Sequence, residues 1–203
     1  MLLYIMRHGE TSWNTDRRIQ GRTDVELNEN GLEMVKKSAE GMKNIKFDYI
    51  YSSPLTRAYT TAETILQGRD IPLFTDDRLM EVCFGEWEGR DITTRQDMLE
   101  AFFDHPETYV ATGGAESYED ILGRARDFLE DVIYPLVVVK PDCKILITGH
   151  AAINRALSAV LKNTPIKDIW APPHRKNCAV DIYELNEECI KVVEEAHYYF
   201  DMK

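Results

Sequence analysis

The chain has 203 residues, of which 44% are hydrophobic and 29% are charged, and its formal net charge is −11. This length suits one domain, residues 1–203, with a substantial buried core. The excess of negative charge disfavours nucleic acid as a partner, because that affinity depends on Lys and Arg neutralising phosphates. No apolar run approaches the roughly 20 residues that span a bilayer, and the short N-terminal run lacks the basic segment that precedes a secretory signal. We therefore expect a cytoplasmic protein without a membrane partner.

The four cysteines lie far apart in the chain and form no C-x-x-C pair; they are Cys83, Cys143, Cys178 and Cys189. This spacing is typical of reduced thiols in a cytosolic protein rather than of a disulfide framework or a zinc site. We expect neither a metal nor a cofactor.

Strand-like and helix-like segments alternate along most of the chain. Apolar runs predict strands at residues 2–7, 48–52, 72–75, 144–148, 179–185 and 190–195. The spacing of apolar residues predicts helices after Asn28, from Ser53-Pro54 to about Leu66, at 92–104, at 117–138 and from His150 through Leu161. Asn28 is predicted to be an N-cap, and Ser53-Pro54 to be a cap followed by an N1 proline.

This alternation is typical of the parallel α/β class. We predict a three-layer sandwich, in which helices flank a mostly parallel central sheet. Residues 85–140 depart from the alternation because they contain helices only. We expect this stretch to form a helical insert that caps the functional site.

Three segments share one design, in which a strand is followed by a short polar turn and a helix. They place Arg7 with His8, Arg57, and His150 beyond the carboxyl ends of strands, where open α/β sheets bind ligands. Gly9 lets the backbone turn there and lets a ligand approach closely. Each residue alone has a plainer interpretation, as a surface arginine or as a capping or core histidine. Together, two arginines and two histidines near helix N-termini predict a pocket for a phosphate group.

Several short motifs occur in a definite order: residues 3–14 (LYIMRHGETSWN), 20–21 (QG), 52–58 (SSPLTRA), 79–81 (LME), 84–89 (FGEWEG) and 148–150 (TGH). This ordered set resembles the histidine phosphatase superfamily, which has the phosphoglycerate-mutase-like fold. The resemblance extends over about residues 1–185.

The resemblance implies a catalytic role for five residues. His8 resembles the nucleophile that accepts the phosphoryl group and becomes phosphohistidine. Arg7, Arg57 and His150 resemble the pocket that holds the phosphate oxygens and stabilises charge in the transition state. Glu81 resembles the general acid that protonates the leaving oxygen and later activates water. Phosphoryl transfer needs these elements: a nucleophile, a proton donor and electrostatic positioning.

The resemblance also implies substrate contacts at the rim of the pocket. Asn14 resembles a further phosphate contact, and the loop at Gln20 and Gly21 resembles the lining of the entrance. Ala151 stands where the family commonly has glycine, and we expect its backbone N–H still to bind phosphate. Residues 113–117 (GGAES) hold one residue more than the family's Gly-Gly-Glu-Ser, which predicts a pocket rim of different shape.

These observations favour a metal-independent phosphomonoesterase that acts on a small phosphorylated metabolite. Phosphoglycerate mutase is the alternative enzyme, but residues 91–120 contain only Arg95 as a basic residue to hold a second anionic group. A phospho-ligand-binding module without activity is a third alternative, and the presence of both His8 and Glu81 disfavours it. The resemblance leaves the metabolite open, because similar proteins of this size include broad-specificity phosphatases as well as phosphatases of α-ribazole phosphate, sugar phosphates and phosphoserine. A homodimer is the working hypothesis for the assembly.

Overall fold

A six-stranded sheet forms the centre of the computed structural model, which describes residues 1–201, apart from the side chains of residues 94–96. Its strands are β1 (Leu2–Arg7), β2 (Tyr49–Ser52), β3 (Leu73–Thr75), β4 (Lys144–Gly149), β5 (Val180–Leu185) and β6 (Ile190–His197). The order across the sheet is β3-β2-β4-β1-β5-β6. The first four strands in this order run parallel, whereas β5 is antiparallel to β1 and β6 is antiparallel to β5.

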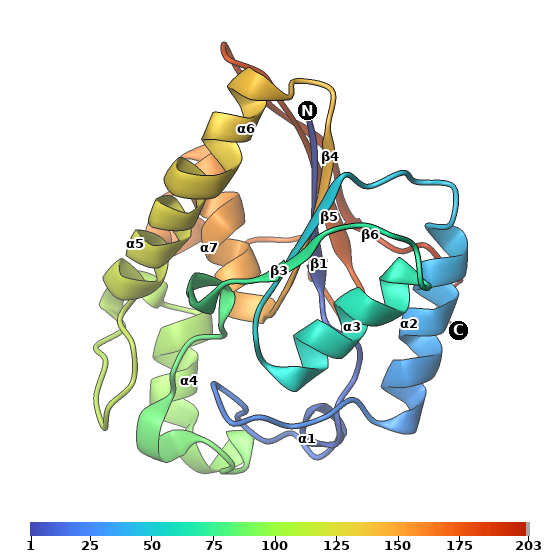
Figure 1. Cartoon of the computed structure of the whole chain (residues 1–203). Helices are drawn as coiled ribbons and strands as arrows, with labels where there is room; N and C mark the ends of the chain where they lie inside the picture. Colours follow the sequence, from blue (N-terminus) through green and yellow to red (C-terminus); the bar gives the residue numbers. More distant parts are fainter. Residues whose placement is uncertain (202–203) are drawn as a thin grey trace.

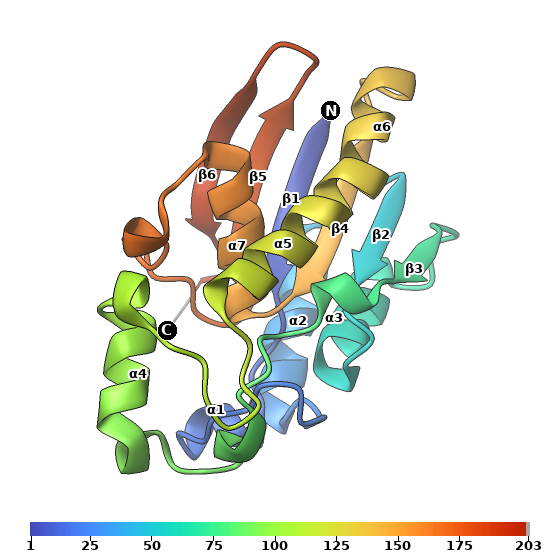
Figure 2. The same cartoon turned by 90° about the vertical axis from the view of Figure 1, so that its left-hand side faces the viewer.

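Helices cover both faces of this sheet, as Figure 1 shows in a view along the edge of the sheet. One face carries α2 (Glu29–Gly41) and α3 (Thr56–Leu66), and the other carries α5 (Tyr118–Phe128), the π-helical turn Leu129–Ile133, α6 (Tyr134–Val139) and α7 (Ala151–Lys162). Figure 2 looks onto the face of the sheet and shows its strands side by side. The alternation of side chains along β1 explains both contacts, because successive residues point to opposite faces. Leu3 and Ile5 pack in the α7 layer, and Tyr4 and Met6 pack in the α2 layer. The predicted three-layer sandwich is confirmed.

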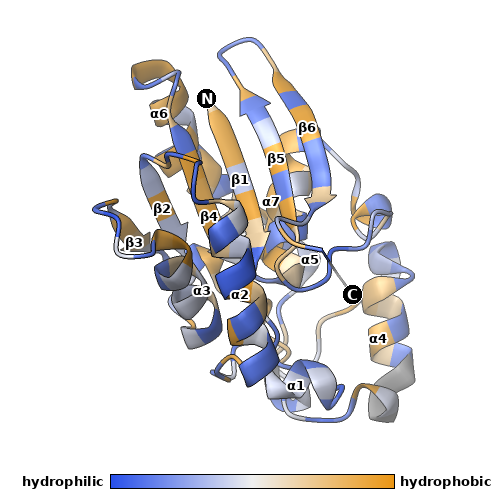
Figure 3. Cartoon of the chain, turned by 90° about the vertical axis from the view of Figure 1, so that its right-hand side faces the viewer, coloured by the Kyte–Doolittle hydropathy of each residue, from blue (hydrophilic) through white to orange (hydrophobic). Residues whose placement is uncertain are grey.

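Hydropathy follows this layering. In Figure 3, β1 and β4 are mainly apolar, whereas much of α2 is hydrophilic. A strand buried on both faces is expected to be apolar throughout, while a surface helix needs only one apolar face. Within the described residues, none of the helices has both the length and the apolar character needed to cross a bilayer.

The predicted insert divides into two parts. Its first part contains α4 (Gln96–Phe103) and lies near the carboxyl end of β1, beside α1 (Ser12–Thr15) (Figure 2). An aromatic cluster holds this part, with Phe102 in ring contact with Phe84 and Tyr118. The second part is α5 and α6, which complete a helical layer of the sandwich. Only the first part is therefore in a position to cap the site.

The start of α3 differs from the prediction. The helix begins at Thr56, with Leu55 as an N-cap that makes no side-chain bond, so the predicted capping role of Ser53-Pro54 is wrong. Asp24 from a distant loop caps the helix instead, because its carboxylate accepts from the Thr56 backbone N–H at 2.8 Å and from the Thr56 hydroxyl at 2.6 Å. Ser53 is thereby free to contact His150. The predicted N-cap at Asn28 is confirmed, since its Oδ1 accepts from the Gly31 N–H.

Short 3₁₀ turns complete the chain at Asp77–Leu79, Gly85–Trp87, Ile92–Arg95, Pro106–Thr108 and Ile166–Asp168.

Candidate active site

A cavity of about 160 Å³ lies at the carboxyl end of β1. Seven of the predicted site residues line it: Arg7, His8, Asn14, Gln20, Gly21, Arg57 and Glu81. The His150 ring lies against the His8 ring, with ring centroids 5.1 Å apart, and is fully buried. Ala151 is not among the described residues that line this cavity. The cavity therefore contains side chains from segments that are far apart in the sequence, as expected for residues that follow different strands of one sheet.

His8 is held in one tautomer by its own neighbour in the chain. Its Nδ1 lies 2.6 Å from the carbonyl oxygen of Gly9. A carbonyl can only accept, so we assign the ring proton to Nδ1, and this leaves the lone pair on Nε2. Burial lowers the pKa of His8 well below 6.5, and the positive charges of Arg57 and Arg7 lower it further. His8 is therefore a neutral imidazole with one free nitrogen, which is the form that can act as a nucleophile.

Arg7 lies at the end of β1, and its side chain is partly buried. Its Nη1 donates to the backbone carbonyl of Arg175 at 2.9 Å. Its Nε is buried and has no hydrogen-bond partner within the described part of the chain. A buried donor without a partner is costly, so a native structure that contains one calls for an explanation. An anion bound beside His8 would satisfy it.

Arg57 lies in the first turn of α3 and is completely buried. Its Nη1 and Nη2 donate to the carbonyl oxygens of Thr23 and Gly21, at 2.8 and 2.7 Å. Its Nε donates to Nδ1 of His150 at 3.1 Å. Since an arginine Nε can only donate, His150 carries its proton on Nε2, which lies 2.8 Å from the Ser53 hydroxyl.

Both ring nitrogens of His150 are thus bonded to protein groups in this structure. Burial lowers the pKa of His150 well below 6.5, as do the charges of nearby arginines, Arg57 foremost. The ring is therefore neutral and supports Arg57. Direct contact of His150 with phosphate stays a prediction.

Glu81 is buried at the N-terminus of α7. Its Oε1 accepts from the backbone N–H groups of Val82, Ala152 and Ile153, at 3.0, 3.1 and 3.2 Å. Its Oε2 has a single contact, to the Ala152 N–H at 3.2 Å. Helix N-termini bind carboxylates in this way because their first N–H groups lack partners within the helix. One oxygen is anchored, and the other keeps capacity for a proton.

Asn14 and Gln20 are oriented by the same threonine. The Thr11 N–H donates to Asn14 Oδ1 at 3.1 Å, and the Thr11 hydroxyl lies 3.0 Å from Gln20 Oε1. With its oxygen held by Thr11, Asn14 has its NH₂ group as the end that can donate to a ligand.

Asn177 is a site residue that the sequence analysis missed. Its Nδ2 lies within hydrogen-bond distance of the carbonyl oxygens of His8 and Gly9, at 3.0 and 3.1 Å, and of Asn14 Oδ1 at 3.2 Å. It belongs to an irregular loop, and no local pattern marks it.

Comparison with known proteins shows the family. The model of the histidine phosphatase superfamily (branch 1) matches residues 3–196. The chain belongs to this superfamily.

Several relatives of this histidine phosphatase carry phosphatase names, and others carry phosphoglycerate mutase names. Phosphoserine phosphatase 1 of Hydrogenobacter thermophilus is 28% identical over 83% of this chain and 80% of its own length. The adenosylcobalamin/α-ribazole phosphatase of Salmonella typhimurium is 30% identical over 91% of this chain and 92% of its own. A mycobacterial glucosyl-3-phosphoglycerate phosphatase, solved as a complex with VO3, superposes with a TM-score of 0.84 at 27% identity, covering 96% of this chain and 98% of its own. The predicted family and enzyme class, phosphoric monoester hydrolase, are confirmed.

Apolar side chains form part of the lining of the histidine phosphatase pocket, and we call this part its apolar wall. Five side chains form it: Ile19, Phe84, Ile92, Leu99 and Phe103. The last three come from the first part of the insert. Arg18 is the one further cation among the described residues that line the pocket, and its Nη1 already donates to the Gly89 carbonyl.

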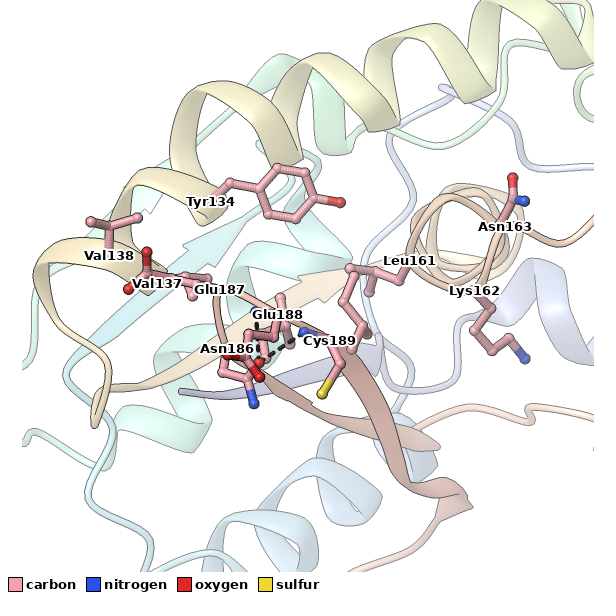
Figure 4. Close-up of a pocket in the computed structure, with 12 residues that line it drawn as sticks. Tyr134, Val137, Val138, Leu161, Lys162, Asn163, Asn186, Glu187, Glu188 and Cys189 are labelled. Atoms are coloured by element: carbon pink, nitrogen blue, oxygen red, sulfur yellow. Dashed lines mark hydrogen bonds between the residues drawn. The ribbon is translucent and has the colours of Figure 1, made fainter.

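A larger cavity of about 600 Å³ lies at the opposite end of the sheet, near the start of β1. Figure 4 shows it between α6, the end of α7 and the β5–β6 turn, with Tyr134, Leu161 and Cys189 at its edge. None of the described residues that line it is a histidine or an arginine. Its one cation among the described lining residues is Lys162, so it lacks both a histidine nucleophile and arginine side chains for a phosphate group. The smaller cavity is therefore the candidate active site. Within the described part of the chain, no group of three or more His, Cys, Asp or Glu is arranged to hold a metal ion.

Proposed function

We propose that this histidine phosphatase hydrolyses small phosphate monoesters without a metal, through a phosphohistidine on His8. One observation carries the proposal above the others. A neutral imidazole with a free Nε2 lies in the same pocket as the guanidinium groups of Arg7 and Arg57, and Arg7 has a buried Nε–H without a partner among the described residues. This is a site prepared for an anion that is attacked by nitrogen.

In the first step, the lone pair of His8 Nε2 attacks phosphorus. The N–P bond forms while the P–O bond to the alcohol breaks, and the bonding electron pair leaves with the alcohol oxygen. Glu81 gives its proton from Oε2 to that oxygen, because Oε1 is held by three backbone N–H groups. The products of this step are a neutral alcohol, phosphohistidine and the Glu81 carboxylate.

In the second step, Glu81 takes a proton from water while the water oxygen attacks phosphorus. The N–P bond breaks, its electron pair returns to Nε2, and inorganic phosphate leaves. Glu81 is again protonated, so the cycle closes. Arg7 and Arg57 stabilise the charge on the phosphoryl oxygens in both steps, and the NH₂ group of Asn14 donates to one of them.

The remaining predicted contacts belong to the rim of the pocket. Gln20 and Gly21 line the entrance. Glu81 accepts from the N–H groups of Ala152 and Ile153, which follow Ala151 in α7, and the predicted contact of the Ala151 N–H with phosphate stays a proposal. We keep Ala151 as a rim residue rather than as part of the catalytic group.

The substrate class follows from the size and lining of the pocket. A cavity of about 160 Å³ accommodates one phosphate group and a small alcohol. The apolar wall favours an alcohol with an apolar face, and the scarcity of further cations disfavours a substrate with a second phosphate. The scarcity of cations for a second phosphate therefore favours hydrolysis over the mutase reaction.

A phosphate-release assay over a panel of phosphomonoesters, with EDTA present, tests the proposal. Wild type should release phosphate from monoesters with apolar alcohols, and His8→Ala should release none. Conversion of 3-phosphoglycerate to 2-phosphoglycerate without net phosphate release would show a mutase instead. Binding of the esters by wild type without turnover would show a binding module.

A further inference from the structure

Glu88 joins the first part of the insert to the loop at residues 20–23. Its Oε1 accepts from the backbone N–H groups of Arg22 and Phe84, both at 3.0 Å. Its Oε2 accepts from the N–H of Thr23 at 2.8 Å and from the Thr23 hydroxyl at 2.7 Å. Four donors converge on one half-buried carboxylate, which is the full acceptor capacity of that group.

The loop that Glu88 holds is the loop that holds Arg57. Thr23 donates its N–H to Glu88 and accepts from Arg57 Nη1 through its carbonyl. Gly21 accepts from Arg57 Nη2. The loop also passes so close to Glu88 that a Cβ on Gly21, whose φ is +55°, would lie 2.1 Å from Glu88 Oε1. The guanidinium of Arg57 is therefore aimed by two carbonyls whose places depend on Glu88.

The negative charge of Glu88 also supports Arg57. Burial lowers the pKa of Arg57, and three carboxylates oppose this effect: those of Glu81, Asp24 and Glu88. Asp24 also ties the end of the loop to the first residue of α3. Asp24 thus anchors one end of the loop, and Glu88 anchors its middle.

We propose that Glu88 is a positioning residue, which fixes the loop at residues 20–23 so that the Arg57 guanidinium is aimed at the phosphoryl group. This inference rests on the proposed function, in which Arg57 stabilises the charge of the transition state. Such positioning has large effects, since a misplacement of about 1 Å costs on the order of 100-fold in rate.

The test compares Glu88→Gln with Glu86→Gln, which changes an exposed glutamate of the same 3₁₀ turn. Glutamine cannot replace Glu88, because its NH₂ group would face two donors in place of one acceptor oxygen. The readouts are kcat and KM for p-nitrophenyl phosphate and the inhibition constant of orthovanadate, which mimics the transferring phosphoryl group. An inhibition constant does not depend on the fraction of folded enzyme, so it separates positioning from loss of fold.

We expect Glu88→Gln to raise the vanadate inhibition constant and to lower kcat/KM, each by about 100-fold, while Glu86→Gln stays within about twofold of wild type. In an Arg57→Ala background, Glu88→Gln should change either quantity by less than about threefold, because its effect passes through Arg57. A full second loss of about 100-fold in that background would overturn the proposal. An unchanged vanadate constant with a lower kcat would also overturn it, by showing only a smaller folded fraction.

Thr23→Val provides a milder variant in case Glu88→Gln does not fold. It removes one of the four donors and keeps the Glu88 charge, so the vanadate constant should rise by about fivefold. A value equal to wild type would contradict the role of Glu88. A wild-type protein that neither hydrolyses the ester nor binds vanadate would refute the proposed function itself, whatever the variants do.

Discussion

Arg57 and His150 are joined by a hydrogen bond from Nε to Nδ1, and this bond determines what each residue can do. It removes the lone pair of His150 from the pocket and turns the ring into a support for the guanidinium. The ring is held in turn by Ser53, which directly follows the last residue of β2. The arginine, the histidine and the serine thus form one chain of contacts behind the nucleophile.

Removing the acceptor on this ring should disable Arg57. His150→Phe keeps an aromatic ring of similar width but leaves the buried Nε–H of Arg57 unpaired, which costs about 1–3 kcal/mol of stability. We expect kcat/KM to fall by about 100-fold through loss of the guanidinium's orientation. Steady-state kinetics and urea denaturation measure the two effects, with the exposed His174→Phe as control. Kinetics equal to wild type would show that Arg57 does not depend on the ring.

The two buried histidines predict a loss of stability in acid. Their pKa values in the folded protein lie well below the unfolded value of 6.5. Below pH 6.5 the unfolded chain therefore binds more protons than the folded one. The free energy of unfolding is highest above this pH, and it decreases as the pH falls toward the folded pKa values. Two groups together predict a slope that approaches about 3 kcal/mol per pH unit as the pH falls from 6.5 toward the folded pKa values.

Urea denaturation between pH 5 and 8 measures this slope. His8→Ala removes one of the two groups, so its slope should be about half that of wild type. Equal slopes for the two proteins would show that His8 titrates normally in the folded state.

The lowered pKa of His8 also affects how the activity depends on pH. His8 keeps its free nitrogen well below pH 6.5, whereas Glu81 must be protonated to assist departure of the alcohol. The profile of kcat/KM should be bell-shaped with its maximum on the acidic side of neutrality. A rate that still rises at pH 9 would contradict Glu81 as the acid.

The side-chain NH₂ group of Asn177 should matter more than the volume of the side chain, because it donates to the backbone beside the nucleophile. Asn177→Ala removes a donor shared by the His8 and Gly9 carbonyls, and we expect kcat/KM to fall by about tenfold. Asn177→Asp should cost more, because a carboxylate would face those carbonyl oxygens and the substrate phosphate. Kinetics of both variants, beside the exposed neighbour Lys176→Ala, test the order. An aspartate variant as active as the alanine variant would contradict the contact.

Gly9 is required for packing rather than for approach of a ligand. A Cβ there would lie 2.7 Å from Val35 Cγ2 and 2.8 Å from the Gly31 carbonyl oxygen, both in α2. Gly9→Ala should therefore destabilise the protein by about 1–3 kcal/mol. Gly123→Ala is the matched control, because a Cβ in that turn of α5 meets nothing within 4 Å. It should stabilise the helix by about 1 kcal/mol, and a stable Gly9→Ala would refute the crowding argument.

The elements that local pattern could predict are those with strong apolar periodicity. β1 and β4 were recognisable because strands buried on both faces are apolar throughout, and their ends located Arg7 and His150. The start of α3 could not be predicted, because Asp24 from another loop accepts from the first N–H of this helix, and Ser53 contacts His150 instead. A cap supplied across the fold has no signature near the helix that it caps.

The contacts that support the site residues could not be predicted from the sequence for the same reason. Asn177 is 169 residues from His8 in the chain, and no local pattern indicates that it reaches the backbone there. Glu88 belongs to the motif at residues 84–89, but its function depends on which four hydrogen-bond donors the fold brings to it. The nucleophile could be predicted because it follows a strand, whereas its supports depend on tertiary packing.

The formation of phosphohistidine on His8 is the central claim, and a trapping experiment tests it most directly. Wild-type enzyme is mixed with a monoester carrying a radiolabelled phosphoryl group, quenched within one turnover in alkali, and digested for mass spectrometry. We predict an acid-labile, alkali-stable phosphoryl group on the peptide that contains His8, and none in His8→Ala. Turnover by wild type without label on that peptide, or label on another residue, would contradict the account.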